Sequence, residues 1–413
     1  MRNLYTISLY AFICISLFFT ACTENISRIG PSPEEEFFKL HGGAFDQQGI
    51  DLLENEGGFL LLGTTSTTTE GESGEMYLVQ TDELGNNQFT AVFSPTLTGA
   101  DATSHAMTAT SDGGFLLSGT VVDEEGQSDA WLVKVNSSLE LMWQQTYGGP
   151  FTDETALAVE EAPDGSIYVL GSTSEVDPLK VPGPQGVRDS SDVSLMKLDP
   201  GGNIIWSKTY GYTGTDKGSD LIILGDDEIL VLGTTDFPDD GSLDKDVLLI
   251  LMNAEGNPFN TQTFGEAGID EIASRFTLLD DKVFITGEQK QGSTSNVLFL
   301  SVDNQLEAVA GPLGISNTRY TVGFDIKPTV DGSGRFIISG TGDTEDDAKL
   351  DILILRVDES GTDLDGPKFI GNQRNDSGAA LLVQNNDLVM IGTTQFLSNT
   401  MMTLLKFDID GDL

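Results

Sequence analysis

The stretch Phe59-Leu-Leu-Leu-Gly-Thr64 decides the fold, because its pattern returns at intervals along the whole 413-residue chain. A short apolar run ends in glycine, and a small or polar residue follows. Clear copies are Phe115-Leu-Leu-Ser-Gly-Thr120 and Tyr168-Val-Leu-Gly-Ser172. The closing glycines of the seven copies are Gly63, Gly119, Gly171, Gly233, Gly287, Gly340 and Gly392. Spacings of 52 to 62 residues are typical of a repeat architecture.

Each repeat contains further segments that have the composition of strands. A second apolar run follows the first, as in Trp131-Leu-Val-Lys-Val-Asn136, and leads into a turn that often contains glycine. A third segment ends in an aromatic or apolar residue plus glycine, as in Trp143-Gln-Gln-Thr-Tyr-Gly148, and residues 155–159 open the next repeat. Four short strands over about 55 residues are typical of one propeller blade. We therefore predict an all-β fold, a seven-bladed β-propeller of four-stranded antiparallel blades.

The two ends of the repeat region complement each other. The last repeat stops just after its third strand and lacks the outermost one. Phe37-Phe-Lys-Leu-His-Gly42 has the pattern of that missing strand, with no preceding strands of its own. We predict that residues 37–42 lie beside 400–407 and complete blade seven, which would hide an open sheet edge. His41 corresponds to Tyr147, so we expect it to pack as a strand residue.

The N-terminus has the features of an export signal. Arg2 precedes an apolar run over residues 7–19, which is short for a membrane span of about 20 residues. The junction Phe19-Thr-Ala-Cys22 resembles the bacterial lipobox. By that resemblance residues 1–21 are a signal peptide and Cys22 carries lipid. An ordinary signal cut near Ala21, or an uncleaved anchor, is the alternative.

The lipobox resemblance also implies where the protein resides. Residues 22–35 are polar and contain two prolines, so they would form a flexible tether between the lipid and the propeller at 36–413. Position 23 is Thr and not the Asp that retains lipoproteins in the inner membrane of enteric bacteria. We therefore expect an outer-membrane lipoprotein that faces the periplasm or the cell surface.

The repeats resemble the SBBP β-propeller repeat of bacterial proteins, with a likeness to lipoproteins of Bacteroidota. The matching stretches are Tyr147-Gly-Gly149 with Asp153, Gly171-Ser-Thr-Ser174, and Gly233-Thr-Thr-Asp-Phe-Pro238. The resemblance covers about residues 36–413 and implies the propeller fold. It does not imply an activity, because propellers host many unrelated functions.

Charge and cysteine content exclude some classes of function. The chain has 65 acidic and 21 basic side chains, a formal net charge of −44. Such a polyanion repels nucleic acid and anionic head groups, and it fits cationic partners, divalent metals or a salty exterior. Solubility alone is the alternative explanation. The two cysteines, Cys14 and Cys22, precede the repeats, so no thiol in the repeat region serves as nucleophile or metal ligand.

An aspartate recurs just before the first strand of many blades. The residues are Asp46, Asp153, Asp216, Asp270 and Asp376, and blades two and six have Thr103 and Tyr320 instead. A ring of carboxylates at the mouth of a central channel could hold Ca²⁺. Alternatively, each Asp caps backbone N–H groups where its strand begins.

The longest insertion, residues 175–192, contains three prolines together with Lys180 and Arg188. It forms a less acidic arm on an acidic face. Long loops on repeat scaffolds often bind partners, which makes these two cations candidate binding residues. A tolerated insertion without a role is equally open.

No catalytic constellation stands out in the sequence. It contains no phosphate loop, zinc motif or Cys/His pair, and His105 has no evident partner, so we assign no catalytic residue and no required cofactor. We predict a monomeric, membrane-tethered, non-catalytic binding or scaffold module for a protein or an extracellular polysaccharide. One alternative is a glycan or peptide hydrolase with paired carboxylates from different blades. Another is a structural component of the envelope. We expect Trp143 and Trp206 to pack between blades.

Overall fold

The computed structural model describes residues 36–66, 74–97, 99–149, 152–174, 191–212, 214–225, 228–236, 244–315, 320–343, 349–384, 387–396 and 399–409. The compact unit Phe37–Leu413 contains all described strands. Within the described residues no helix is long and apolar enough to cross a membrane. The predicted signal peptide, Cys22 and the tether lie outside these residues.

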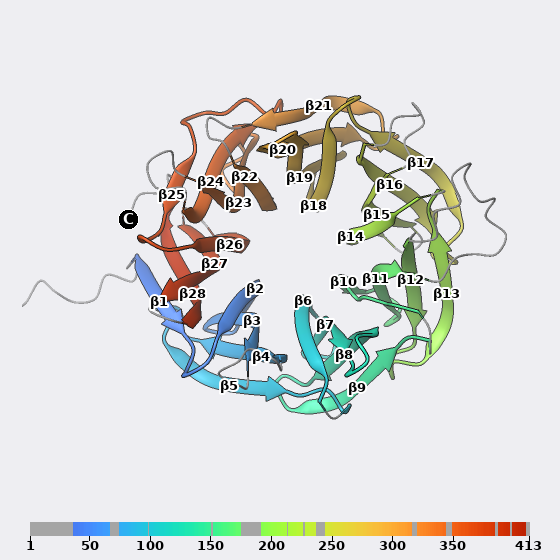
Figure 1. Ribbon diagram of the computed structural model, residues 1–413, viewed down its shortest axis with the longest axis vertical. Helices are drawn as coiled ribbons and strands as arrows, with labels where there is room; N and C mark the ends of the chain where they lie inside the picture. The colour runs from blue at the N-terminus through green and yellow to red at the C-terminus, as the bar shows by residue number, and fades with distance from the viewer. Residues whose placement is uncertain are drawn as a thin grey trace, which may run out of the picture. The chain divides into compact units, whose positions relative to one another are not determined.

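The described strands form seven antiparallel sheets of four strands each, which confirms the predicted all-β propeller. Figure 1 shows these blades around one axis, with the first strand of each innermost and the last at the rim. Blade 1 consists of β2 (Gln47–Asn55), β3 (Gly58–Ser66), β4 (Gly74–Thr81) and β5 (Asn87–Phe93). Blade 2 consists of β6 (Asp101–Ala109), β7 (Phe115–Val122), β8 (Ser128–Val135) and β9 (Leu141–Tyr147). Blade 3 consists of β10 (Ala158–Glu161), β11 (Ile167–Thr173), β12 (Asp192–Leu198) and β13 (Ile204–Tyr210).

The remaining blades repeat this order. Blade 4 consists of β14 (Asp216–Leu224), β15 (Glu228–Thr235), β16 (Asp246–Asn253) and β17 (Pro258–Phe264). Blade 5 consists of β18 (Asp270–Leu279), β19 (Lys282–Gln291), β20 (Thr294–Asp303) and β21 (Ala308–Ile315). Blade 6 consists of β22 (Thr321–Pro328), β23 (Arg335–Asp343), β24 (Leu350–Asp358) and β25 (Lys368–Ile370). Blade 7 consists of β26 (Asp376–Gln384), β27 (Asp387–Phe396), β28 (Asn399–Asp408) and β1 (Phe37–His41).

Strand β1 closes the ring as predicted. It pairs antiparallel with β28, with Phe37 opposite Lys406 and His41 opposite Met402. The two ends of the repeat region therefore share one sheet, and β1 lies at its outer edge (Figure 1). His41 is buried, in agreement with its expected role as a packing residue.

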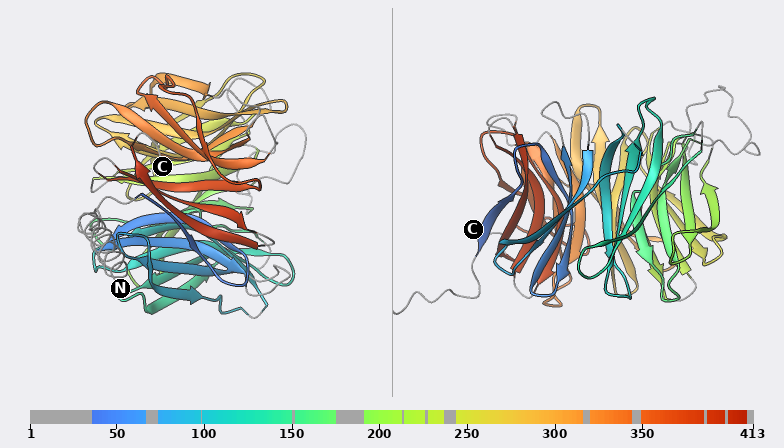
Figure 2. Two further views of the ribbon diagram at one scale, coloured as in Figure 1. Left: turned by 90° about the vertical axis from the view of Figure 1, so that its left-hand side faces the viewer. Right: turned by 90° about the horizontal axis from the view of Figure 1, so that it is seen from below.

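The blades are seen from the side in Figure 2, with connections on two opposite faces. We call one the loop face: it carries the connections into each first strand and those between second and third strands, such as 94–100 and 123–127. The other, the turn face, carries the tight turns between first and second and between third and fourth strands, such as 110–114 and 199–203.

The hydrophobic core lies between blades. The described residues form seven apolar clusters, each combining side chains from two neighbouring blades. In one, Leu62 of blade 1 packs with Trp131 of blade 2, and in another, Leu404 of blade 7 packs with Leu61 of blade 1. Both faces of each sheet are thus covered, which explains why the third strands are apolar throughout instead of alternating.

The repeated glycine makes room for a bulge in the neighbouring inner strand. A Cβ on Gly63 would lie 2.2 Å from the backbone oxygen of Gln48, and the other six glycines would meet an inner-strand oxygen in the same way. Just past this contact the register of the inner strand shifts by a β-bulge in six blades. The glycine that marks the repeat in sequence is therefore required by close backbone approach.

Outer strands are fastened to the following blade. The hydroxyl of Tyr147 donates to the backbone oxygen of Gly202 at 2.7 Å, and that of Tyr210 donates to Gly256 at 2.7 Å. Trp143 packs against the core shared with blade 3, and Trp206 lies against the turn at Gly256. The expected packing of both tryptophans between blades is confirmed.

Candidate functional site

The predicted strand-start aspartates occupy two positions and not one. The repeat glycine opposite each inner strand gives the reference point. Asp46 and Asp270 lie three residues before the inner-strand residue that pairs with this glycine, whereas Asp216 and Asp376 lie two residues before it. Asp153 belongs with the first group, since the isolated bridge between Glu154 and Thr173 ahead of β10 places Ala156, three residues after Asp153, opposite Gly171.

Blade 2 does contain the recurring aspartate, so the assignment of Thr103 to this position was wrong. The residue that pairs with Gly119 is Ser104, and Asp101 stands three residues before it. Ser104 and Ala106 are both small, so a small residue stands three positions after Asp101 and also three positions after Thr103, and the sequence alone does not tell which one pairs with the glycine. In blade 6 the position is held by Tyr320, as expected.

These carboxylates link neighbouring blades through backbone groups. Asp101 accepts a hydrogen bond from the N–H of Gly74 at 2.6 Å, and Asp153 accepts one from the N–H of Ser128 at 3.0 Å. Asp270 accepts a hydrogen bond from the backbone N–H of Lys245 at 3.1 Å. In each case the acceptor lies at the start of an inner strand and the donor at the start of the third strand in the preceding blade. Their position in the fold favours the capping interpretation.

Asp46 makes the same link across the closure of the ring. It accepts hydrogen bonds from the backbone N–H of Thr400 at 2.6 Å and from the hydroxyl of the same residue at 3.1 Å. Asp216 and Asp376 instead accept from the N–H groups of Tyr212 and Asn372, each at 2.7 Å. In the described part of the chain no group of three or more acidic, His or Cys side chains is placed to hold a metal ion. Lys180 and Arg188 lie outside that part.

A charged cluster on the propeller axis was not anticipated. The residue two positions after the inner-strand partner of each repeat glycine holds an equivalent place in every blade: Asp51, Ala106, Ala158, Asp220, Arg275, Asp325 and Ala380. Arg275 of blade 5 lies 3.0 Å from Asp51 of blade 1 and 4.0 Å from Asp325 of blade 6. Blades 1 and 5 are not neighbours, so the guanidinium bridges blades across the axis.

Each of the three axial aspartates uses both carboxylate oxygens. Oδ1 of Asp51 accepts from the N–H of Leu52 at 3.0 Å, and Oδ2 accepts from the N–H of Met107 in blade 2 at 2.9 Å. In the same way Asp220 accepts from the N–H groups of Leu221 and Phe276, and Asp325 accepts from those of Ile326 and Leu381. In all three cases the second donor lies 56 residues after the aspartate. Each aspartate therefore ties its inner strand to that of the next blade.

Two residues further along their inner strands stand Thr108, Glu160 and Lys327. The hydroxyl of Thr108 donates to Glu160 at 3.2 Å, and Lys327 lies 3.1 Å from Asp325. Burial, followed by the charge of Asp220, raises the pKa of Glu160 to about 7. Burial also raises the pKa of Asp220 to about 6, against the opposing charges of Arg275 and Lys327. Carboxyl groups with such pKa values are candidates for general acid–base chemistry.

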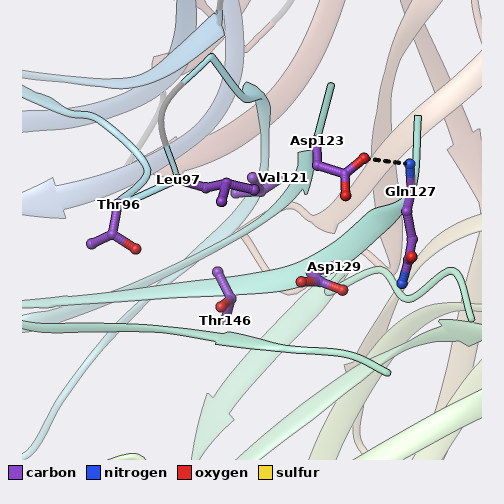
Figure 3. A pocket seen from close by; sticks show the side chains of 7 residues that line it. All are labelled: Thr96, Leu97, Val121, Asp123, Gln127, Asp129 and Thr146. Atoms are coloured by element: carbon purple, nitrogen blue, oxygen red, sulfur yellow. Dashed lines mark hydrogen bonds between the residues drawn. The ribbon is translucent and has the colours of Figure 1, made fainter. Parts of the chain in front are cut away.

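A small pocket opens on the loop face (Figure 3). Its volume is about 170 Å³, and its lining consists of Thr96, Leu97, Val121, Asp123, Gln127, Asp129 and Thr146. Asp123 accepts a hydrogen bond from the N–H of Gln127 at 2.9 Å. Burial raises the pKa of Asp129, and the charges of Glu154, Asp123 and Asp153 add to the effect. The pocket is below the roughly 300 Å³ at which small-molecule sites begin.

The sequence carried a signal for the axial acids. Gly49-Ile-Asp-Leu52, Gly218-Ser-Asp-Leu221 and Gly323-Phe-Asp-Ile326 share a Gly-x-Asp-apolar motif at equivalent repeat positions. A search for acids in register with the inner strand would have found it. His105 lies at a bulge, 3.0 Å from the hydroxyl of Thr120, and burial lowers its pKa to about 4.

Solved structures share the fold at low sequence identity. No protein-family model and no curated protein sequence matches the chain. A polysaccharide lyase described as an ulvan lyase has a TM-score of 0.55 at 12% identity, over 90% of this chain and 96% of the lyase. A lectin from Burkholderia pseudomallei has a TM-score of 0.54 at 11% identity, over 86% of this chain and 93% of the lectin. These similarities support the β-propeller fold and nothing finer.

Proposed function

We propose that the chain is an exported, membrane-tethered propeller of the SBBP type that binds a protein or an extracellular polysaccharide without altering it. The supporting observation is the hydrogen bonding of the axial aspartates Asp51, Asp220 and Asp325. In all three, both carboxylate oxygens accept backbone N–H groups from two blades. Carboxylates engaged in this way hold strands together and are poorly placed to act on a substrate.

The loop face is the proposed recognition surface. Its pocket has acidic walls at Asp123 and Asp129, and in the sequence the predicted arm at 175–192 comes between β11 and β12, the second and third strands of blade 3. Acidic walls favour ligands with cationic or hydroxyl groups. A lectin and a polysaccharide lyase among the proteins with this fold are consistent with polymer binding on such a scaffold.

The membrane tether belongs to the same proposal. It is supported by the lipobox pattern at Cys22 and by the polar segment that follows. Mass spectrometry of the purified protein should detect an acylated Cys22 as the first residue of the mature chain. A mature chain that begins elsewhere would contradict the tether while leaving the binding role open to its own test.

Capture of a partner from the native envelope tests the binding role. The full-length chain is compared with a pocket variant, Leu97→Ser with Asp129→Asn, and with a variant lacking 175–191. Val330→Ser with Glu83→Gln on the turn face is the matched control. We expect saturable capture by the native chain and the control, and loss in at least one loop-face variant. Absence of saturable capture by the native chain would contradict the proposal.

A hydrolase is the second candidate, because one observation favours it. Glu160 of blade 3 has a pKa raised to about 7, and it is not one of the axial aspartates that tie two blades together. Its carboxyl could act as the general acid on a glycan or peptide bond, with a carboxylate of another blade as its partner. In that case Glu160→Gln would abolish cleavage of the polymer without weakening its capture.

A further inference from the structure

Exposed apolar side chains gather on the rim of four consecutive blades. We define the rim belt as Leu141 and Met142 of β9, Ile204 and Ile205 of β13, Phe259 of β17 and Val309 of β21. Their exposed fractions lie between 47% for Leu141 and 61% for Met142. All occupy the first two residues of their outer strand, the end next to the turn face. A single exposed apolar side chain is ordinary, but apolar side chains that recur at one position on successive strands favour an interaction surface.

The strands that carry the rim belt are fastened to one another by hydrogen bonds. Gln145 of β9 donates to the backbone oxygen of Gly201 in the next blade at 2.9 Å, and Lys208 of β13 donates to that of Glu255 at 2.6 Å. Asn260 of β17 donates to that of Gln305 at 2.8 Å. Each outer strand is therefore fixed to the turn that precedes the next one, and Figure 1 shows the four strands following one another around the rim.

The turns beside the rim belt are acidic. The four turns 136–140, 199–203, 253–257 and 303–307 contain Glu140, Asp199, Glu255, Asp303 and Glu307, and no Lys or Arg. Among the described residues, no ion pair joins these acids to a basic side chain. The charge repels anionic lipid and a second copy of this chain, which carries the same acids and a net charge of −44.

The outer strands of the rim belt also have a sheet edge at which a further strand could pair. Each of β9, β13, β17 and β21 is the last strand of its described sheet, so one edge has no described strand partner. Extended peptides add to such edges through main-chain hydrogen bonds, while alternate side chains select the sequence.

We propose that the rim belt docks an extended segment of a partner protein in which apolar residues alternate with Lys or Arg. Apolar side chains would cover the rim belt, and the cations would meet the acidic turns. This surface lies apart from the loop-face pocket, so the inference does not depend on the ligand proposed for that face.

A peptide probe tests this docking surface. Fluorescence anisotropy measures binding of a synthetic peptide of alternating Lys and Val residues to the full-length chain. Peptides of alternating Lys and Ser, and of alternating Glu and Val, separate charge from apolar contact. The apolar variant is Ile205→Ser with Phe259→Ser, and its control is Val330→Ser with Phe396→Ser, which are equally exposed elsewhere. The charge variant is Glu255→Gln with Glu307→Gln, and its control is Glu124→Gln with Glu125→Gln on the loop face.

We expect both rim variants to bind the Lys/Val peptide at least about tenfold more weakly than the native chain and the controls do. Equal binding by rim variants and controls would overturn the proposal, as would equal binding of the Lys/Ser peptide. The peptide could fail to bind while the chain associates with phosphatidylcholine vesicles or with itself. If the apolar variant loses that association, the rim belt binds lipid or a second copy, and the proposal is overturned. Loss of envelope capture at the loop face would leave these results unchanged, so the two proposals fail independently.

Discussion

Arg275 and Asp51 are 224 residues apart in sequence, yet the guanidinium of one lies 3.0 Å from the carboxylate of the other. They belong to inner strands on blades that do not touch in the ring order. Asp220 and Asp325, on the blades either side of Arg275, complete its acidic surroundings. Burial acts to lower the pKa of Arg275, but the charges of these three acids outweigh it and raise that pKa. The guanidinium of Arg275 therefore links the inner strand of blade 5 to those of blades 1 and 6.

Replacement of Arg275 by Met should destabilise the propeller substantially. Asp51 would lose its ion-pair partner, while Asp325 would keep Lys327 at 3.1 Å. A broken buried pair of this kind costs about 2 to 4 kcal/mol when a quarter of the cation is exposed. The free energy of unfolding in urea measures the loss. Lys282→Met removes a pair with Glu359 that is more exposed, and it should cost at most about 1 kcal/mol. Similar losses in the two variants would argue against a special role for the axial cation.

Glu160 should make the fold less stable as the pH rises. Its pKa in the folded chain is about 7, against an ordinary value of 4.5. Between these values the folded chain keeps a proton that the unfolded chain has released, so the free energy of unfolding falls through this window, by up to about 3 kcal/mol. Glu160→Gln removes this contribution. Urea unfolding at about pH 5 and about pH 8 should show a smaller decline for the variant; an equal decline would refute the assignment.

The links made by the strand-start aspartates should contribute modestly to stability. Asp46→Ala removes the acceptor for Thr400 across the ring closure, and Asp270→Ala removes the acceptor for Lys245 between blades 4 and 5. Each should lower the free energy of unfolding by about 1 kcal/mol. The comparison shows whether the closure is weaker than an ordinary blade junction. A gain in stability in either variant would indicate that the acid is held for another purpose.

Calcium distinguishes a cation ring from backbone capping. If the strand-start acids only accept hydrogen bonds from backbone N–H groups, millimolar Ca²⁺ should raise the Tm no more than the same concentration of Mg²⁺ does. A rise specific to Ca²⁺, absent with chelator and reduced in Asp216→Asn and Asp376→Asn, would instead establish a metal site. Differential scanning fluorimetry of the native chain and these variants gives the result.

The fold could be predicted from the sequence because each blade needs particular residues at fixed positions of the repeat. Gly63 and its six equivalents recur where the inner strand approaches closely, and the aromatic-Gly endings mark outer strands that bond to the next blade. The strand at Phe37–His41 was recognisable because it has the outer-strand pattern without the strands that precede it. Each of these signals reflects a backbone or packing requirement that every blade must meet.

The site was harder to predict, because its residues meet only after the ring closes. Arg275 and Asp51 occupy equivalent positions in different blades, and sequence distance says nothing about which blades face each other. In blade 2 two small residues, Ser104 and Ala106, compete as the reference point in the sequence, which placed Thr103 where Asp101 stands. Glu160 has a raised pKa because of burial and Asp220, neither of which a local pattern contains.

Cleavage of the ligand tests the proposed binding role most directly. Polysaccharide and peptide fractions from the native envelope are incubated with the native chain, with Glu160→Gln and without protein, and their mass distributions are compared. A module that only binds leaves all three distributions identical. New, shorter fragments that the native chain produces and Glu160→Gln does not would contradict it and make Glu160 catalytic.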